Sequence, residues 1–246
     1  MQIFLEAETI FHIGAFNITN TYLTSLLVVL GLCAFGYFFS KRIEYVPKKL
    51  QNAVEYIIEG LFGFFEKVFD DREKTKKYFS FIITLFLFII LSNWLGIFPG
   101  MGTIGIYEEH NGKEILVPFF RSVNSDINMT LALAVISVIA TNLLGIATIG
   151  FFKHAKKFIN FKGPIDFFVG ILELVSEVAK IISFSFRLFG NIFAGEVLLV
   201  VMAFLLPYIV PLPFMALELF VGFIQALVFS MLTVVFLKIA MEDVAH

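Results

Sequence analysis

Long apolar stretches, separated by short polar segments, divide the chain into helices that can cross a membrane. Uncharged windows cover residues 21–40, 79–98 and 130–152, and two longer apolar segments cover 164–206 and 214–240. About 20 apolar residues in a helix span a hydrocarbon core. The pattern therefore predicts an all-α integral membrane protein with about five transmembrane helices.

The segment 50–70, between the first and second spans, has a different pattern. Apolar residues such as Leu50, Val54 and Ile57 recur every three or four positions, and the polar residues fall largely on the other side. This periodicity predicts an amphipathic helix that lies along the inner membrane face. The charged residues 70–77 that follow are expected to form a solvated connection.

The two C-terminal apolar segments predict a long helical hairpin. Pro207, Pro211 and Pro213 lie between them and are expected to form an irregular turn. The segment 164–206 is too long for an upright helix in a core of about 30 Å. The hairpin is therefore expected to tilt steeply, run partly along the interface, or break.

Composition supports a membrane protein and excludes several other classes. The 246 residues are 59% hydrophobic and 15% charged, with a mean hydropathy of +0.91. The net charge of −2 and the lack of a basic tail give no indication of nucleic-acid binding. Cys33 is the single cysteine, so no disulfide framework or metal cluster is expected. Without a glycine-rich phosphate loop, we expect no nucleotide site, no cofactor and no catalysis on this chain.

The distribution of basic residues predicts the topology. Loop 41–78 holds nine Lys and Arg residues and segment 153–162 holds four, whereas loop 99–128 holds two. The positive-inside rule places the two basic segments in the cytoplasm. Residues 1–20 are then on the outer side of the membrane and the C-terminus is in the cytoplasm. Residues 1–20 contain no Lys or Arg residue, which argues against a cleaved signal peptide.

Arg187 is the most informative residue, because it interrupts one of the longest apolar stretches. An ionised guanidinium in a membrane is costly and cannot lose its proton. It requires an anionic partner or a wet cavity. We therefore interpret Arg187 as part of a functional site.

Arg187 belongs to a polar stripe along one face of the predicted helix. At about 100° per residue, this face carries Glu173, Ser176, Lys180, Ser183, Arg187 and Asn191. The stripe indicates a polar partner or water. Alternatively, its serine and asparagine side chains only join helices by hydrogen bonds.

The following segment carries polar residues that match this stripe. A single antiparallel register of the hairpin would place Arg187 opposite Gln225, and Glu196 opposite Glu218. Two neighbouring carboxylates at membrane depth share protons, which suits a proton relay. In the simpler alternative one of them, more readily Glu218, extends to the outer surface.

Several of these residues stand in motifs that resemble a known family. The stretch Arg187-Leu-Phe-Gly-Asn191-Ile-Phe-Ala-Gly-Glu196, followed by Gln225-Ala-Leu-Val-Phe, is similar to subunit a of F-type ATP synthases, as are Ser92-Asn93 and Asp126-Ile-Asn-Met-Thr130. The resemblance implies a stator beside a rotating ring of c subunits, with peripheral-stalk b subunits and the rest of the complex as partners. It also implies an energy-coupling membrane, such as a bacterial inner membrane.

The resemblance implies a role for each site residue. Arg187 would attract the deprotonated ring carboxylate and block a direct proton leak between two half-channels. The outer half-channel would be lined by Asn191, Glu196, Glu218, Gln225 and Asn93, and the inner one by Glu173, Lys180 and Ser183. Many family members carry a histidine in place of one of the two glutamates, whereas the histidines of this chain stand at positions 12, 110, 154 and 246.

Two other functions are compatible with a polar membrane hairpin. A self-contained ion-coupled transporter predicts sequence repeats and interrupted helices in both halves, and neither is evident. A scaffold for a complex at the inner membrane face would not need Arg187 in the membrane. Copurification separates the three hypotheses, because only a synthase subunit brings a ring and a catalytic head.

Overall fold

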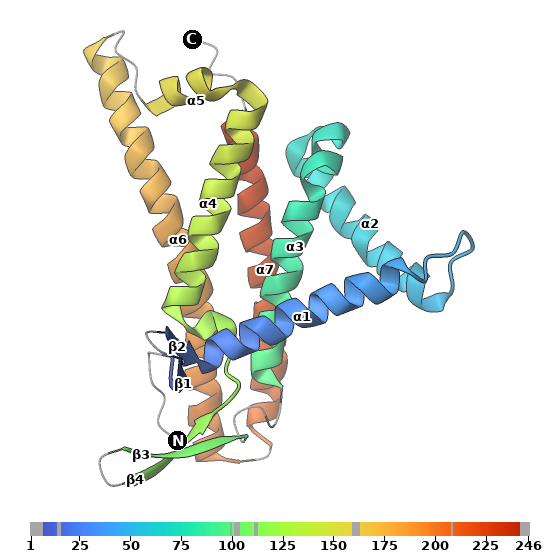
Figure 1. Ribbon diagram of the computed structural model, residues 1–246, viewed down its shortest axis with the longest axis vertical. Coiled ribbons are helices and arrows are strands. Elements are labelled where there is room, and N and C mark those ends of the chain that lie inside the picture. The colour runs from blue at the N-terminus through green and yellow to red at the C-terminus, as the bar shows by residue number, and fades with distance from the viewer. Residues whose placement is uncertain are drawn as a thin grey trace.

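The structure is a computed structural model, and it describes residues 7–13, 16–98, 100, 104–110, 113–158, 163–207 and 209–241. The chain consists mainly of long helices, with a few short strands and short helices between them (Figure 1). In chain order the elements are β1 (Thr9–Ile13), β2 (Phe16–Thr19), α1 (Asn20–Ser40), α2 (Lys49–Phe69), α3 (Arg72–Ile97), β3 (Gly105–His110), β4 (Lys113–Pro118), η2 (Val123–Ser125), α4 (Ile127–Ile149), α5 (Phe151–Phe158), α6 (Pro164–Leu205) and α7 (Pro211–Met241). The C-terminus was predicted to be cytoplasmic, and its residues 242–246 lie outside the described residues.

The fold class predicted from the sequence is confirmed. Among the described residues, five helices are long and apolar enough to cross a membrane: α1, α3, α4, α6 and α7. The last four form a bundle in which α6 and α7 run in opposite directions (Figure 1). Its core is built by buried apolar side chains of all four helices: Phe86, Ile89, Ile90, Ala134, Phe184, Leu188, Ile192, Ala226 and Phe229.

α1 and α2 extend to one side of this bundle. α1 runs across the bundle axis, and α2 returns to the start of α3 (Figure 1). The amphipathic pattern of α2 explains its docking, because Phe65 and Phe69 are buried against α3 and α7. Lys238 of α7 also donates a hydrogen bond to the carbonyl oxygen of Val68, in the last turn of α2.

The second span begins earlier than its apolar window indicates. α3 begins at Arg72 rather than at residue 79, so most of the charged segment is the first part of a helix rather than a separate connection, and its charged side chains are exposed, as expected for a solvated segment. The carboxylate of Asp71 explains this start, since it accepts hydrogen bonds from the backbone N–H groups of Glu73 and Lys74 at 2.9 and 3.2 Å. Such caps satisfy N–H groups that have no partner within the helix.

The third span ends earlier than its apolar window indicates. α4 ends at Ile149 because Gly150 adopts a φ of +89°, a conformation that favours glycine. A separate short helix, α5, then begins at Phe151. The sequence analysis did not predict α5, since eight residues give a weak periodic pattern.

The hairpin contains one very long helix. α6 has 42 residues without a break, which corresponds to roughly 63 Å at 1.5 Å per residue. α7 begins at Pro211 rather than at residue 214, because proline is tolerated in the first turn, where its missing N–H costs nothing. Pro207 lies in the turn between the two helices.

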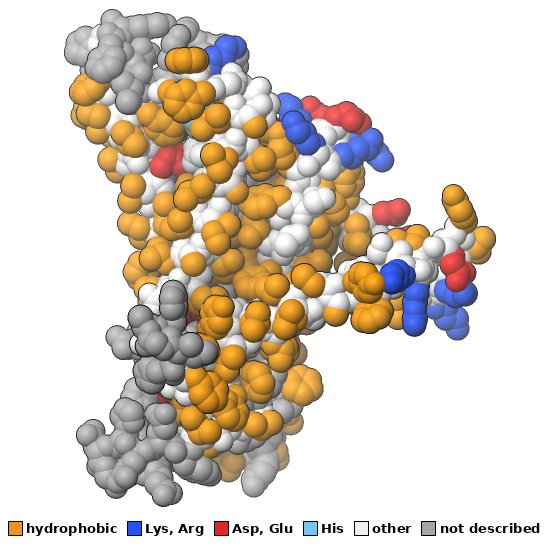
Figure 2. Space-filling model, in the orientation of Figure 1, with side chains coloured by type: hydrophobic (Ala, Val, Ile, Leu, Met, Phe, Trp, Pro, Cys, Tyr) orange, Lys and Arg blue, Asp and Glu red, His pale blue; other side chains and the backbone are white. Residues whose placement is uncertain are grey.

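The two ends of the bundle differ in character. The antiparallel β3–β4 hairpin, in which Gly105 pairs with Pro118, lies at the same end as the α6–α7 turn (Figure 1). α5 and the start of α3 lie at the other end. Figure 2 shows hydrophobic side chains along the sides of the molecule, with basic side chains gathered around the start of α3 and the α1–α2 connection.

Candidate functional site

Arg187 lies near the middle of α6 and is exposed on the surface of the chain. Its Nη2 donates a hydrogen bond of 3.1 Å to Oγ of Ser183, one turn earlier on the same helix. Among the residues that the structure describes, no carboxylate forms an ion pair with Arg187. Its neighbours Ile182 and Phe186 are 51% and 58% exposed. The arginine therefore lies beside an exposed apolar surface, and it shares its own face of the helix with the exposed polar side chains of Ser183 and Asn191.

One turn further along α6, Asn191 connects the helix to α7. Its Nδ2 donates a hydrogen bond of 2.8 Å to Oε1 of Gln225. The predicted register placed Gln225 opposite Arg187, and the structure places it one turn away, opposite Asn191. Gln225 is buried, and its Nε2 has no hydrogen-bond partner within the described part of the chain.

Glu218 lies against Gly195, the residue that precedes Glu196, which agrees with the register that paired the two glutamates. Glu218 is only 6% exposed, so the alternative in which it extends to the surface is not supported. Its carboxylate packs against Gly195, where a Cβ atom would collide with it. Glu196 instead forms an ion pair with Arg121, with a distance of 3.4 Å between Oε2 and Nη2.

Asn93 of α3 lies beside α7 and is almost fully buried. Its Nδ2 donates a hydrogen bond of 3.0 Å to the carbonyl oxygen of Gly222, and its Oδ1 accepts one of 2.7 Å from Asn124. Around it, several buried polar atoms have no partner among the described residues: Ser92 Oγ, Ser122 Oγ and Asn124 Oδ1. Buried polar groups in proteins are nearly always hydrogen-bonded, often to water.

The residues predicted for the inner side lie toward the α5 end. Glu173 and Lys180 line the same narrow cavity of about 20 Å³, a volume that holds about one water molecule. Lys180 forms an ion pair of 2.6 Å with Glu177. Ser183 lies outside the cavity lining and contacts Arg187 instead.

A hydrogen-bonded chain extends this inner cluster to α5. Asn142 donates to Glu177 Oε2 at 2.9 Å, and its Oδ1 lies 3.0 Å from Nε2 of His154. The amide nitrogen of Asn142 also donates to Val138, so its Oδ1 is the acceptor and His154 Nε2 carries the proton. Burial lowers the pKa of His154 below its ordinary value of 6.5, and the charge of Lys157 lowers it further.

Sequence reasoning missed four of these residues: Arg121, Asn142, His154 and Glu177. None of them lies on the predicted stripe. Glu177 stood in the sequence as a second charge near Lys180, which was the only available signal. The other three reach the site through contacts between elements that local periodicity does not reveal.

Other polar pairs join helices away from these residues. Thr130 and Ser185 are 3.1 Å apart, and Ser137 and Thr233 are 2.9 Å apart, in both cases between hydroxyl oxygens. These pairs fit the alternative in which small polar side chains hold membrane helices together. Ser176 of the predicted stripe takes no part in the contacts described above.

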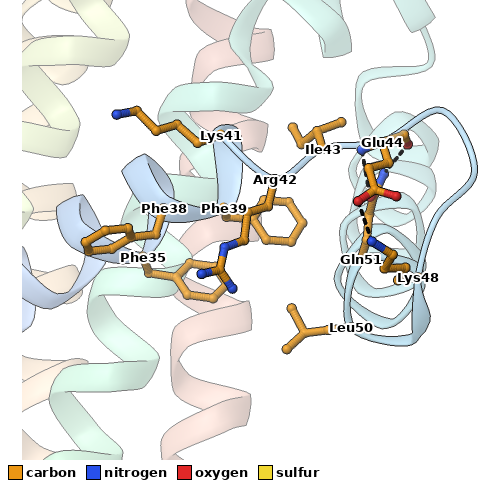
Figure 3. Close-up of a pocket in the computed structure, with 10 residues that line it drawn as sticks. All are labelled: Phe35, Phe38, Phe39, Lys41, Arg42, Ile43, Glu44, Lys48, Leu50 and Gln51. Carbon is orange, nitrogen blue, oxygen red and sulfur yellow. Dashed lines mark hydrogen bonds and ion pairs between the residues drawn. The ribbon is translucent and has the colours of Figure 1, made fainter.

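A cavity of about 790 Å³ lies between the end of α1 and the start of α2 (Figure 3). It is lined by apolar residues such as Phe35, Phe38 and Leu50 and by charged ones such as Arg42, and contains none of the predicted site residues. No group of three or more histidine, cysteine or acidic side chains that could hold a metal occurs in the described part of the chain.

The chain is similar to many proteins of one family. The family model described as ATP synthase A chain matches residues 22–238. ATP synthase subunit a of Syntrophobacter fumaroxidans is 35% identical over 94% of this chain and 85% of the relative. The same subunit of Campylobacter concisus is 33% identical over 89% of this chain and 88% of the relative. That of Campylobacter fetus subsp. fetus is 30% identical over 96% of this chain and 95% of the relative.

The match covers all five candidate spans nearly completely and includes every residue of the polar site described above. The identity is spread over most of both chains, so it does not reflect a shared short motif. This chain belongs to the ATP synthase subunit a family.

Proposed function

We propose that this chain conducts protons along two polar paths that approach each other at Arg187. Membership of the subunit a family makes the chain a proton-translocating stator subunit of the F-type ATP synthase. The subunit has no catalytic role of its own and works with the c ring and the other subunits of the complex. Membership of this family therefore argues against the two alternative functions, an independent transporter and a simple scaffold.

One observation carries the proposal: among the described residues the charge of Arg187 has no ionic partner, and it lies beside an exposed apolar surface of α6. In the most apolar 18-residue window of α6, 11% of the residues are buried within the chain, against 39% in the corresponding windows of α3 and α7. A charge that is exposed to lipid is costly, so Arg187 requires an anionic partner from another chain. A carboxylate on each passing ring subunit meets this requirement and would dock beside Ile182 and Phe186.

The outer path would run from the β3–β4 end of the bundle toward Arg187. Glu196 and Glu218 lie nearest that end, and Asn93, Asn191 and Gln225 lie between them and the arginine. Buried polar atoms that have no partner among the described residues, such as Gln225 Nε2 and Asn124 Oδ1, support a path that water can enter.

The inner path would run from Arg187 toward α5. Ser183 holds the guanidinium, and the cavity beside Glu173 and Lys180 continues in the direction of His154. With the basic loops in the cytoplasm, this end is the inner one, and residues 1–20 lie outside. The relatives named above are bacterial proteins, which supports a bacterial energy-coupling membrane.

Site-directed photo-crosslinking of assembled complexes tests the docking face. In a Cys33→Ser background, a thiol-linked benzophenone at Ile182→Cys or Phe186→Cys should capture a small ring subunit with an acidic residue in a membrane helix. Leu188→Cys is the matched control, because Leu188 lies on the same helix and is fully buried. Equal capture from the control, or none from the exposed positions, would contradict the proposal.

A further inference from the structure

A second arginine, Arg121, enters the outer part of the site from the loop that follows β4. Its Nη2 lies 3.4 Å from Oε2 of Glu196 on α6. The two side chains are 9% and 29% exposed, so the pair is largely removed from solvent. Arg121 and Glu196 are 75 positions apart in the sequence, and the contact depends on the tertiary fold.

The backbone around Arg121 is anchored on two neighbouring helices. Its N–H donates a hydrogen bond of 3.2 Å to Oγ1 of Thr24, which is buried on α1. The next residue, Ser122, packs so closely on Gly96 of α3 that a Cβ atom there would collide with it. This anchoring holds the guanidinium at a fixed depth in the site.

The neighbouring carboxyl group of Glu218 has no comparable partner. It is buried against Gly195, the residue that precedes Glu196 in α6. Within the described part of the chain, no cation and no hydrogen-bond donor lies within bonding distance of Glu218. Among the described residues, this part of the site thus contains two acidic side chains and the cation of Arg121, which contacts Glu196.

This asymmetry divides the roles of the two glutamates. A buried charge is tolerated when it is paired, and an unpaired acid avoids the cost by holding a proton. With its charge compensated by Arg121, Glu196 stays a carboxylate. Glu218 is then the group that takes a proton from the outer side, passes it toward the ring carboxylate, and is left as a carboxylate until it is protonated again.

We propose that Arg121 is a positioning residue that fixes Glu196 as a carboxylate and leaves Glu218 as the proton-exchanging group of the outer path. The inference rests on the proposed function, since it assigns roles within that path.

Charge-removing variants in assembled complexes test the assignment through ATP-driven proton pumping in inverted vesicles. Arg121→Ala leaves the charge of Glu196 uncompensated beside Glu218 and should slow pumping at least about tenfold, which corresponds to about 1.4 kcal/mol of added barrier. Arg121→Lys keeps the positive charge and should retain most of the rate. Glu218→Gln should slow pumping more than Glu196→Gln.

The double variant Arg121→Ala/Glu196→Gln separates charge from folding. It lacks the same arginine side chain as the single variant, so a folding defect would persist, whereas the charge defect is relieved. We expect it to pump faster than Arg121→Ala alone, and Arg121→Ala/Glu218→Gln to show no such recovery.

Three results would overturn the inference: wild-type pumping by Arg121→Ala, an equally slow or slower Arg121→Ala/Glu196→Gln variant, or recovery through Glu218→Gln. Arg187→Ala measured in parallel distinguishes this failure from that of the proposed function. Normal pumping by Arg187→Ala would reject the proposed function. Loss of pumping in Arg187→Ala, together with normal pumping in Arg121→Ala, would reject only the role of Arg121.

Discussion

Asn191 on α6 donates a hydrogen bond of 2.8 Å to Gln225 on α7, one helical turn from Arg187. This bond joins the two helices of the hairpin at Asn191, the last residue of the polar stripe. The second polar atom of Gln225, Nε2, has no partner among the described residues. Gln225 can therefore serve the path as well as hold the helices together.

The first prediction tests this double role of Gln225. Gln225→Leu removes both polar atoms and should slow proton pumping about tenfold, which corresponds to about 1.4 kcal/mol of added barrier. Ser137→Ala is the control, because its hydrogen bond to Thr233 joins two helices outside the path. That variant should lose only about 0.6 kcal/mol of stability and keep its pumping rate. Equal rates of the two variants would assign Gln225 a purely structural role.

Most of the fold was predictable from the sequence, because each long helix carries its own apolar signal. Helix ends were less predictable, since they depend on single residues. Asp71 starts α3 inside a charged segment, and Gly150 stops α4 within an apolar one. The β-hairpins and α5 escaped prediction because short elements carry little periodic pattern.

The site was predictable in part. The face of α6 with Arg187 and Asn191 follows from helical periodicity. Matching polar positions predicted that Glu196 lies near Glu218, but they paired Gln225 with Arg187, one turn away from its partner Asn191 in the structure. Arg121 and His154 could not be predicted in the same way. They reach the site from a loop and from a short helix, and only the tertiary packing of separate elements brings them there.

A second prediction concerns Gly195, against which the carboxylate of Glu218 packs. Gly195→Ala should cost about 1–3 kcal/mol through overpacking and lower the amount of assembled subunit. Gly190→Ala is the matched control on the same helix, because a Cβ atom there meets no other atom within 4 Å. The amounts of both variants in purified complexes measure the effect. Equal assembly of the two would show that α6 and α7 do not pack this closely at Gly195.

A third prediction follows from the lowered pKa of His154. Burial is the main cause of this lowering, the charge of Lys157 lowers the pKa further, and the charge of Glu177 partly opposes the shift. The folded state favours the neutral ring, so this contribution to stability is complete above about pH 6.5, the unfolded value. It is lost as the pH falls from there toward the lower folded pKa. The hydrogen-exchange rate of residues 151–158, corrected for the intrinsic pH dependence of amide exchange, should therefore rise on acidification below pH 6.5.

His154→Gln is the control for this pH effect, because its amide cannot titrate. Exchange in this variant should not change in the same pH range beyond the intrinsic chemical dependence. Slower exchange of the unmodified chain at acidic pH, after the same correction, would contradict a neutral His154 in the folded state.

A fourth prediction tests the topology. In a Cys33→Ser background, single cysteines at Lys74 and Lys153 should react with a membrane-impermeant thiol reagent only from the cytoplasmic side. A cysteine at Ile104, which is 58% exposed, should react only from the outside. Labelling from the opposite sides would contradict the predicted topology, and the paths now assigned as inner and outer would have to be interchanged.

The central claim is that Arg187 is the charge past which every transported proton must move. ATP-driven quenching of a pH-sensitive dye in inverted vesicles, with Arg187→Ala complexes assembled to wild-type levels, tests it most directly. We predict that the alanine variant abolishes coupled pumping, and that Arg187→Lys fails as well, since a compact ammonium lacks the delocalised guanidinium charge and can lose its proton when desolvated. Near-normal pumping by Arg187→Ala would contradict the assignment of the site.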